Sequence, residues 1–159
     1  FLCYVFGPRH GCHNKAWTVY VELGMSLEAR VGPVGKAKMV SDLMDETAVI
    51  DSTGICTLVT PMVFTEAPAA YKAVLEKEGT VDEMRRIGRG ITDLERWLDT
   101  ERGHTKAKDS LPALLIEAEV TVNGRKVRVG EEAWAQLRDE YYRYRGWSPD
   151  GVPNLVVAQ

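Results

Sequence analysis

The segment at residues 51–57, DSTGICT, places a carboxylate, a glycine and a thiol close together in the chain. Asp51 can accept hydrogen bonds from the ring N–H and amino groups of a heterocycle. Gly54 permits backbone conformations and a close ligand approach that a Cβ atom would block, and Cys56 can bind iron as a thiolate. A cofactor-binding turn is one interpretation. The alternative is an Asp-initiated turn with a buried Cys that packs as a small apolar side chain.

A second polar stretch, GCHNK at residues 11–15, offers an imidazole in His13 and a cation in Lys15. Imidazoles as a class change charge near neutral pH, which suits proton transfer. Together with His10, Cys12 and His13 also suggest a metal site, although their spacing fits no standard zinc pattern. Proton transfer, zinc binding and an ordinary surface histidine are the three interpretations of this stretch.

Two further features favour structural roles. His104 follows Gly103 at a predicted helix end, where a cation interacts favourably with the helix dipole. An aromatic run with interleaved arginines lies at residues 141–147, and its helical spacing favours core packing over stacking on nucleic-acid bases.

Composition excludes several classes of protein. The 159 residues match one domain, and 20 basic against 23 acidic residues give a net charge of −3, so we expect no nucleic-acid partner. No apolar stretch is long enough for a membrane span. Three widely spaced cysteines argue against a disulfide framework, so a cytoplasmic location is expected. Because Phe1 opens within an apolar run, we expect the chain to be a fragment of a longer polypeptide.

Apolar periodicity predicts the elements that carry these residues. Residues 1–35 are rich in glycine and proline, and they predict loops around one short element at 17–23. Apolar positions at three-and-four spacing predict a helix over 36–48 that ends near Ile50. After the turn at 51–57, residues 58–64 and 65–78 return to helical character.

The second half of the chain has clear end signals. Thr80 and Glu83 form a capping box for a helix that reaches Gly103, and its apolar residues at heptad-like intervals are Met84, Ile87, Ile91, Leu94 and Leu98. Leu111 and Pro112 open another element. A hairpin near 120–128 is predicted from Asn123-Gly124, and a helix over 131–145 is predicted to stop at Gly146. We therefore expect one mainly α, irregular helical domain over residues 1–159, with residues 36–159 helical apart from a small β-hairpin.

Several motifs in this order resemble the C-terminal region of the aldehyde:ferredoxin oxidoreductase family. The DSTGIC sequence at 51–56 looks like the family's D-x-x-G-L-C pterin-binding motif, with Ile55 in place of the usual Leu. The other similar segments are GRGITDLER at 88–96, ERG at 101–103, DSLP at 109–112, YYRYRGW at 141–147 and DGVP at 150–153. The resemblance covers most of the chain and implies that the chain is a C-terminal helical domain whose residues 1–35 form a loop-rich active-site segment.

The resemblance also implies roles for particular residues. Family members hold tungsten, or sometimes molybdenum, between two pterins, and a four-iron four-sulfur cluster lies beside one pterin. Asp51, Gly54 and Ile55 would contact a pterin, and Cys56 would be the fourth cysteine of the cluster. By a less direct match, His13 would be the catalytic acid or base, and Lys15 would contact a pterin.

The implied reaction is the two-electron oxidation of an aldehyde to a carboxylic acid, with ferredoxin as electron acceptor, although some family members, such as aryl-CoA reductases, act on other substrates. The cluster's other cysteines and the first pterin motif belong to the N-terminal part of such an enzyme, so the cofactors would be incomplete or absent in this fragment alone. A homo-oligomer is compatible with this interpretation. The alternative is a cofactor-free helical interaction or assembly module that retains the fold.

Overall fold

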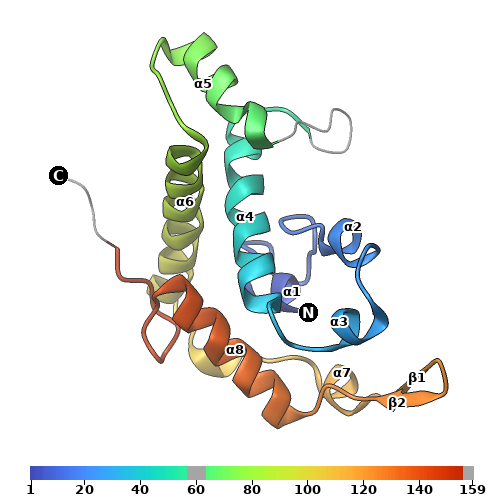
Figure 1. Cartoon of the computed structure of the whole chain (residues 1–159). Helices are drawn as coiled ribbons and strands as arrows, with labels where there is room; N and C mark the ends of the chain where they lie inside the picture. The colour runs from blue at the N-terminus through green and yellow to red at the C-terminus, as the bar shows by residue number, and fades with distance from the viewer. Residues whose placement is uncertain (57–63, 156–159) are drawn as a thin grey trace.

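The computed structural model of the chain describes residues 1–56 and 64–155 (Figure 1). This described part is mainly α, with short 3-10 helices and one two-stranded sheet, which confirms the predicted fold class. The elements are α1 (Leu2–Phe6), α2 (Thr18–Glu22), α3 (Leu27–Val31), α4 (Lys36–Ser52), η1 (Phe64–Glu66), α5 (Ala67–Leu75), α6 (Val81–Glu101), η2 (Lys106–Lys108), α7 (Ala113–Glu117), β1 (Val120–Val122), β2 (Arg125–Val127) and α8 (Glu131–Arg145). No helix within these ranges combines the length and apolarity needed to cross a bilayer.

The long helices α4 and α6 lie side by side and form the centre of the fold (Figure 1). Their contact depends on Gly88 of α6, because a Cβ atom built there would lie 2.1 Å from the carbonyl oxygen of Asp45 on α4. Real Cβ atoms do not approach a carbonyl oxygen so closely, so only glycine allows the two backbones to meet at this distance. α8 crosses the lower ends of both helices in the same view.

A buried arginine of α8 ties the three long helices together. The Arg145 guanidinium donates to Asp45 Oδ1 at 2.5 Å and to Ser41 Oγ at 3.0 Å, both on α4, and also to Asp93 on α6. The side chain of Arg145 is fully buried. Charge-assisted bonds of this kind fix the relative orientation of the helices, because removing one partner would leave a buried charge unpaired.

A second buried ionic group centres on Asp109, which follows η2 and has no exposed surface. Arg96 of α6 donates to both of its carboxylate oxygens, at 2.9 and 2.5 Å, and the Tyr142 hydroxyl of α8 donates to it as well. His104 Nε2 lies 2.7 Å from Asp109 Oδ1. His104 lies beyond the end of a helix, as the sequence predicted. Its ring, however, contacts the buried Asp109 carboxylate, whereas the sequence predicted only an interaction with the helix dipole.

Aromatic side chains fill the core between α1 and α8. The Phe6 and Tyr141 rings stack with centroids 4.3 Å apart, and Trp147 packs edge-on against both. Tyr141, Tyr142 and Trp147 are all buried. The prediction that this aromatic run packs in the core is therefore confirmed.

The local end signals behave as the sequence predicted. The Thr80 hydroxyl accepts from the Glu83 amide at 3.1 Å and caps α6. Asn123 and Gly124 both have positive φ, +50° and +75°, as a type I′ hairpin turn requires. Gly146 ends α8 in the left-handed conformation, with φ of +69°.

Other boundaries differ from the predictions. Residues 1–35 contain three short helices, α1, α2 and α3, where one element was expected. α4 continues to Ser52, so Asp51 lies in its last turn instead of starting a new one. Of the apolar repeat predicted on α6, Met84 is buried, whereas Ile87, Leu94 and Leu98 are exposed. The predicted helical run at 58–63 lies outside the described residues.

Candidate functional site

The loop that follows α1 is held against that helix by three contacts to backbone carbonyl oxygens. The Gly11 amide donates to the Tyr4 carbonyl at 2.8 Å, and His10 Nδ1 lies 2.9 Å from the Val5 carbonyl oxygen. The buried Cys3 thiol points at the Cys12 carbonyl, 3.6 Å away. α1 is therefore a platform that fixes residues 10–12 and with them the position of the next residue, His13.

His13 lies between two aromatic side chains at the surface. The Tyr4 hydroxyl is 3.3 Å from His13 Nδ1, and the Trp17 ring meets the imidazole edge-on at a centroid distance of 5.2 Å. These contacts restrict the ring, and they leave Nε2 without a hydrogen-bond partner among residues 1–56 and 64–155. An imidazole held at Nδ1 can exchange a proton with a substrate through Nε2.

The structure brings together the two chemically suggestive stretches of the sequence. Lys15 Nζ lies 2.6 Å from Asp51 Oδ2, although 36 residues separate them. The Lys15 side chain is 14% exposed and that of Asp51 is 41% exposed, so the pair lies at the edge of the core and keeps one carboxylate face open. The loop after α1 and the end of α4 thus meet and form one candidate site.

The turn after α4 presents its functional groups outward. The Gly54 amide donates to the Asp51 carbonyl at 3.1 Å, and the Ile55 amide donates to the Thr53 hydroxyl at 3.3 Å. Gly54 has φ of +76°, a conformation that L side chains rarely adopt, and the space where its Cβ would point is open for 4 Å. Ile55 and Cys56 are exposed, and Cys56 is a free thiol. The alternative of a buried, apolar Cys56 is therefore wrong.

One acidic residue of the site had not been expected from the sequence. Burial raises the pKa of the Glu95 carboxyl on α6, the nearby Lys15 ammonium opposes this shift, and Asp51 and Asp99 reinforce it. Glu95 is thus electrostatically coupled to the Lys15–Asp51 pair. Within the sequence it stands among other charged residues of one helix, and no local pattern distinguishes it.

The residues present are of the types that a pterin and a cluster require. A half-exposed carboxylate, an ammonium group, open space beside a glycine and an exposed thiol all lie at the ends of α4 and the α1 loop. Pterins need hydrogen-bond acceptors for their amino and ring N–H groups, and iron needs thiolate. Over the described ranges no set of three or more His, Cys, Asp or Glu side chains converges on a common point. The zinc alternative therefore finds no support there, and a cluster at Cys56 needs cysteines from elsewhere.

Comparison with known proteins identifies the family to which this sequence belongs. The family model for aldehyde ferredoxin oxidoreductase, domains 2 and 3, matches residues 1–157. The chain belongs to the aldehyde ferredoxin oxidoreductase family. This membership confirms the resemblance carried by the motifs.

Curated relatives within the aldehyde ferredoxin oxidoreductase family are much longer proteins. The chain is 31% identical over 158 residues to a tungsten-containing aldehyde ferredoxin oxidoreductase of Pyrococcus horikoshii, and 32% identical over 161 residues to that of Pyrococcus furiosus. Each alignment covers 94% of this chain and 25% of the relative. The chain thus spans about a quarter of the length of the relatives it matches.

A solved structure supports the same fold. The chain superimposes with a TM-score of 0.58 on the active site complex BamBC of benzoyl coenzyme A reductase in complex with 1,5-dienoyl-CoA. The match covers 76% of this chain and 18% of that chain at 22% identity. At this identity the likeness concerns the fold alone.

Proposed function

We propose that the chain is the C-terminal part of a tungsten- or molybdenum-pterin oxidoreductase that oxidises aldehydes to carboxylic acids and passes electrons through a four-iron four-sulfur cluster to ferredoxin. The observation that carries this proposal is the 2.6 Å contact between Lys15 and Asp51. It joins two stretches whose residue types each suit cofactor or proton chemistry, in a chain whose relatives are tungsten-containing enzymes.

In this proposal Lys15, Asp51, Gly54 and Ile55 contact one pterin. The open side of the Asp51 carboxylate accepts from pterin N–H groups, while Lys15 holds the carboxylate in place and supplies a donor. The positive φ of Gly54 turns the chain so that Ile55 and Cys56 face outward together. The pterin-bound metal supplies the redox chemistry when it is present, and the protein supplies orientation and charge.

His13 is the proposed acid or base. Oxidation of an aldehyde to an acid adds one oxygen from water and releases two protons with the two electrons. In the tautomer whose Nδ1–H donates to the Tyr4 oxygen, His13 Nε2 is unprotonated and would accept one of these protons. Trp17 keeps the ring from rotating away.

Cys56 is the proposed iron ligand of this chain. The other three cluster cysteines, the second pterin site and a carboxylate partner for His13 would come from the remaining, N-terminal part of a protein as long as the relatives. That part is the principal partner in this proposal. Ferredoxin is the electron acceptor.

The proposal is tested by iron and tungsten or molybdenum analysis of the full-length protein, purified without oxygen. We expect both iron and one of the two heavier metals in the unmodified protein. Cys56→Ser should lose at least one iron per cluster, whereas Cys12→Ser, which lies in the other stretch of the site, should keep the full iron content. A full-length protein without either metal would instead support the cofactor-free module.

His13→Asn separates proton transfer from metal binding. We expect turnover of an aldehyde to fall by about 10²- to 10⁴-fold, the usual contribution of general acid–base catalysis, while the metal content stays unchanged. Retained turnover at every pH would show that His13 carries no proton in the reaction.

A further inference from the structure

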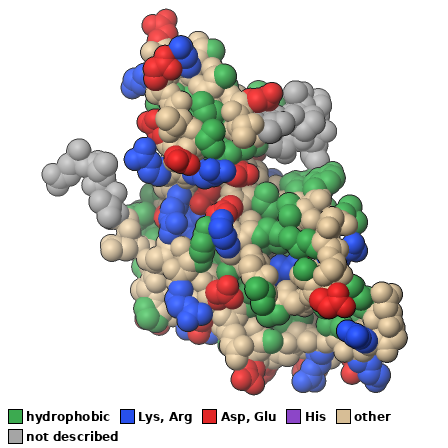
Figure 2. All heavy atoms as spheres, in the orientation of Figure 1, with side chains coloured by type: hydrophobic (Ala, Val, Ile, Leu, Met, Phe, Trp, Pro, Cys, Tyr) green, Lys and Arg blue, Asp and Glu red, His purple; other side chains and the backbone are tan. Residues whose placement is uncertain are grey.

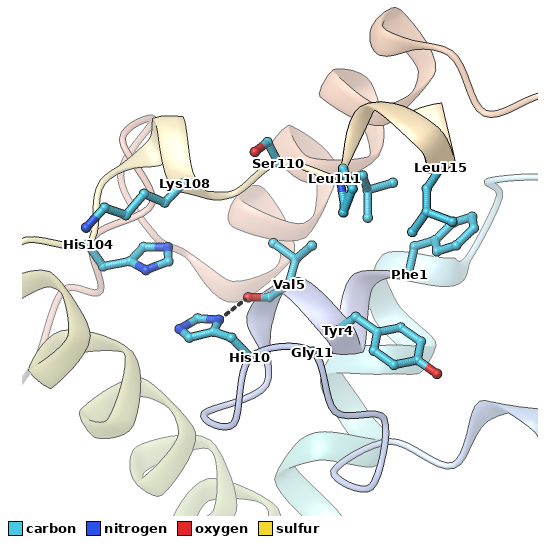
Figure 3. A pocket seen from close by; sticks show the side chains of 11 residues that line it. Phe1, Tyr4, Val5, His10, Gly11, His104, Lys108, Ser110, Leu111 and Leu115 are labelled. Atoms are coloured by element: carbon cyan, nitrogen blue, oxygen red, sulfur yellow. Dashed lines mark hydrogen bonds between the residues drawn. The ribbon is translucent and has the colours of Figure 1, made fainter. Parts of the chain in front are cut away.

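A cavity of about 570 Å³ opens between α1, the loop that follows it, and the segment from His104 to α7 (Figure 3). Its volume falls within the range of about 300–1,000 Å³ that is typical of small-molecule sites. None of its lining residues is assigned to the pterin or to the cluster. The cavity therefore needs its own explanation.

Two stacked imidazoles form one edge of this cavity. The His10 and His104 rings lie nearly parallel, with centroids 4.9 Å apart and an interplanar angle of 9°. His10 Nδ1 faces the Val5 carbonyl oxygen at 2.9 Å, and its Nε2 faces Asp99 Oδ2 at 3.4 Å. Both ring nitrogens of His10 therefore already face oxygen atoms of the protein.

The second imidazole is held from behind by the buried ionic group. Asp109 Oδ1 fixes His104 Nε2, and the same carboxylate is neutralised by the bidentate Arg96. This support leaves the other edge of the His104 ring for the cavity. A ring locked in this way is preorganised and loses little entropy when a ligand binds.

Lys108 adds a positive charge that no carboxylate balances. Its ammonium donates to the Gly103 carbonyl at 2.9 Å, and it forms no ion pair within the described part of the chain. Neither Asp nor Glu is among the described residues that line the cavity. Since Asp109 pairs with Arg96, the charge at this edge without a carboxylate partner among the described residues is that of Lys108.

The opposite walls are apolar. Figure 3 shows Val5 and Leu111 above the loop and Phe1 and Leu115 at the far end of the cavity. Tyr4 contributes its ring to the same wall, while its hydroxyl reaches His13. A ligand that fits therefore carries a negative group at one end and a compact apolar body at the other.

We propose that this cavity binds an organic carboxylate with a compact apolar body. Lys108 supplies the charge-assisted contact, and the apolar walls select the body over a simple inorganic anion. The proposal goes beyond the oxidoreductase function, because binding here requires neither a metal nor turnover. Because a carboxylate is also the product of the proposed oxidation, the Lys108 variant is needed to separate binding in this cavity from binding beside His13.

The test is calorimetric titration of the full-length protein with benzoate. Benzyl alcohol keeps the ring without the charge, and inorganic phosphate keeps the charge without the ring. We expect benzoate to bind at least tenfold more tightly than either. Equal binding of phosphate would reduce the site to a general anion contact and overturn the proposal, as would equal binding of benzyl alcohol.

Two lysine variants test whether benzoate binds in this cavity. Lys108→Met keeps the length of an exposed side chain and should weaken benzoate binding about tenfold, whereas the exposed Lys77→Met, outside the cavity, should leave it unchanged. Benzoate should also protect His10, 43% exposed at its side chain, from diethyl pyrocarbonate without protecting His13. Unchanged affinity in Lys108→Met, or protection of His13 in place of His10, would refute the assignment.

Discussion

Replacing Gly88 by Ala tests the close contact on which the α4–α6 pair depends. The added Cβ would lie 2.1 Å from the Asp45 carbonyl oxygen, whereas ordinary contact begins at 3.4 Å, so the helices must separate by more than the side chains around them can absorb. Overpacking of a core costs about 1–3 kcal/mol, and the upper end applies because the opposing atom is helix backbone. Removing a helical glycine returns about 0.5–1 kcal/mol. We expect a net loss of about 2 kcal/mol.

Gly90→Ala is the matched control on the same helix. A Cβ at Gly90 meets no atom within 4 Å, so only the backbone gain remains, and stability should rise by about 0.5–1 kcal/mol. The assay is urea unfolding of the chain followed by circular dichroism, with free energies taken from the midpoint at equal slope. If Gly88→Ala unfolds at the same urea concentration as Gly90→Ala, the close approach of α4 and α6 is wrong.

Three further predictions concern buried charge and the site. Asp109→Ala leaves the buried Arg96 unpaired and should cost about 3–5 kcal/mol in thermal or urea unfolding, while the exposed Asp150→Ala should cost almost nothing. Tyr4→Phe removes the contact at His13 Nδ1, worth about 1 kcal/mol, so ¹⁵N shifts of His13 should show a changed balance between its two tautomers; unchanged shifts would exclude the contact. Burial raises the pKa of Glu95 above its ordinary value of 4.5, so its ionised form destabilises the fold, and stability falls as the pH rises through the raised pKa. Glu95→Gln should therefore match the wild type below pH 4.5 and exceed it at neutral pH; equal urea midpoints at both would contradict the burial.

Local chemistry explains which elements the sequence could predict. The cap at Thr80, the turn at Asn123-Gly124 and the stop at Gly146 each depend on one or two residues and their own backbone. Such local signals therefore predict a helix end or a turn whatever the rest of the chain packs against. The short helices α1 and α3 have five residues each and lie in a stretch rich in glycine and proline, and that composition predicted loops in their place.

The candidate site was partly predictable for a different reason. Lys15 and Asp51 were found because each lies in a stretch of unusual chemical types, but their contact spans 36 residues and no local pattern encodes it. The role of Tyr4 has the same origin, since it exists only because α1 folds against the loop. Glu95 carries no distinguishing pattern at all. Side-chain type predicted the candidates, and tertiary packing determined which of them meet.

The surface of the described chain carries an excess of apolar side chains that its own fold does not bury. Figure 2 shows hydrophobic side chains gathered on the side where α2 lies, and the exposed residues of that region include Val19, Tyr20 and Leu23. Contiguous apolar patches on soluble proteins usually mark contact surfaces. This region adjoins the loop that carries His13 and Lys15, so a partner that covers it would also approach the candidate site.

The prediction of a buried apolar stripe on α6 was wrong because its side chains are also among the exposed apolar residues. The heptad-like repeat predicted a buried stripe, yet the buried residues of α6 include Gly88, Thr92 and Arg96, while Ile87, Leu94 and Leu98 are 37%, 48% and 40% exposed. The apolar periodicity of a helix reflects all the surfaces that the helix buries in the complete protein. The relatives are about four times as long as the aligned segment, which is 25% of each. Proteins of that length have further chain against which such an apolar stripe can pack, so an apolar repeat on a helix does not require burial within the segment described here.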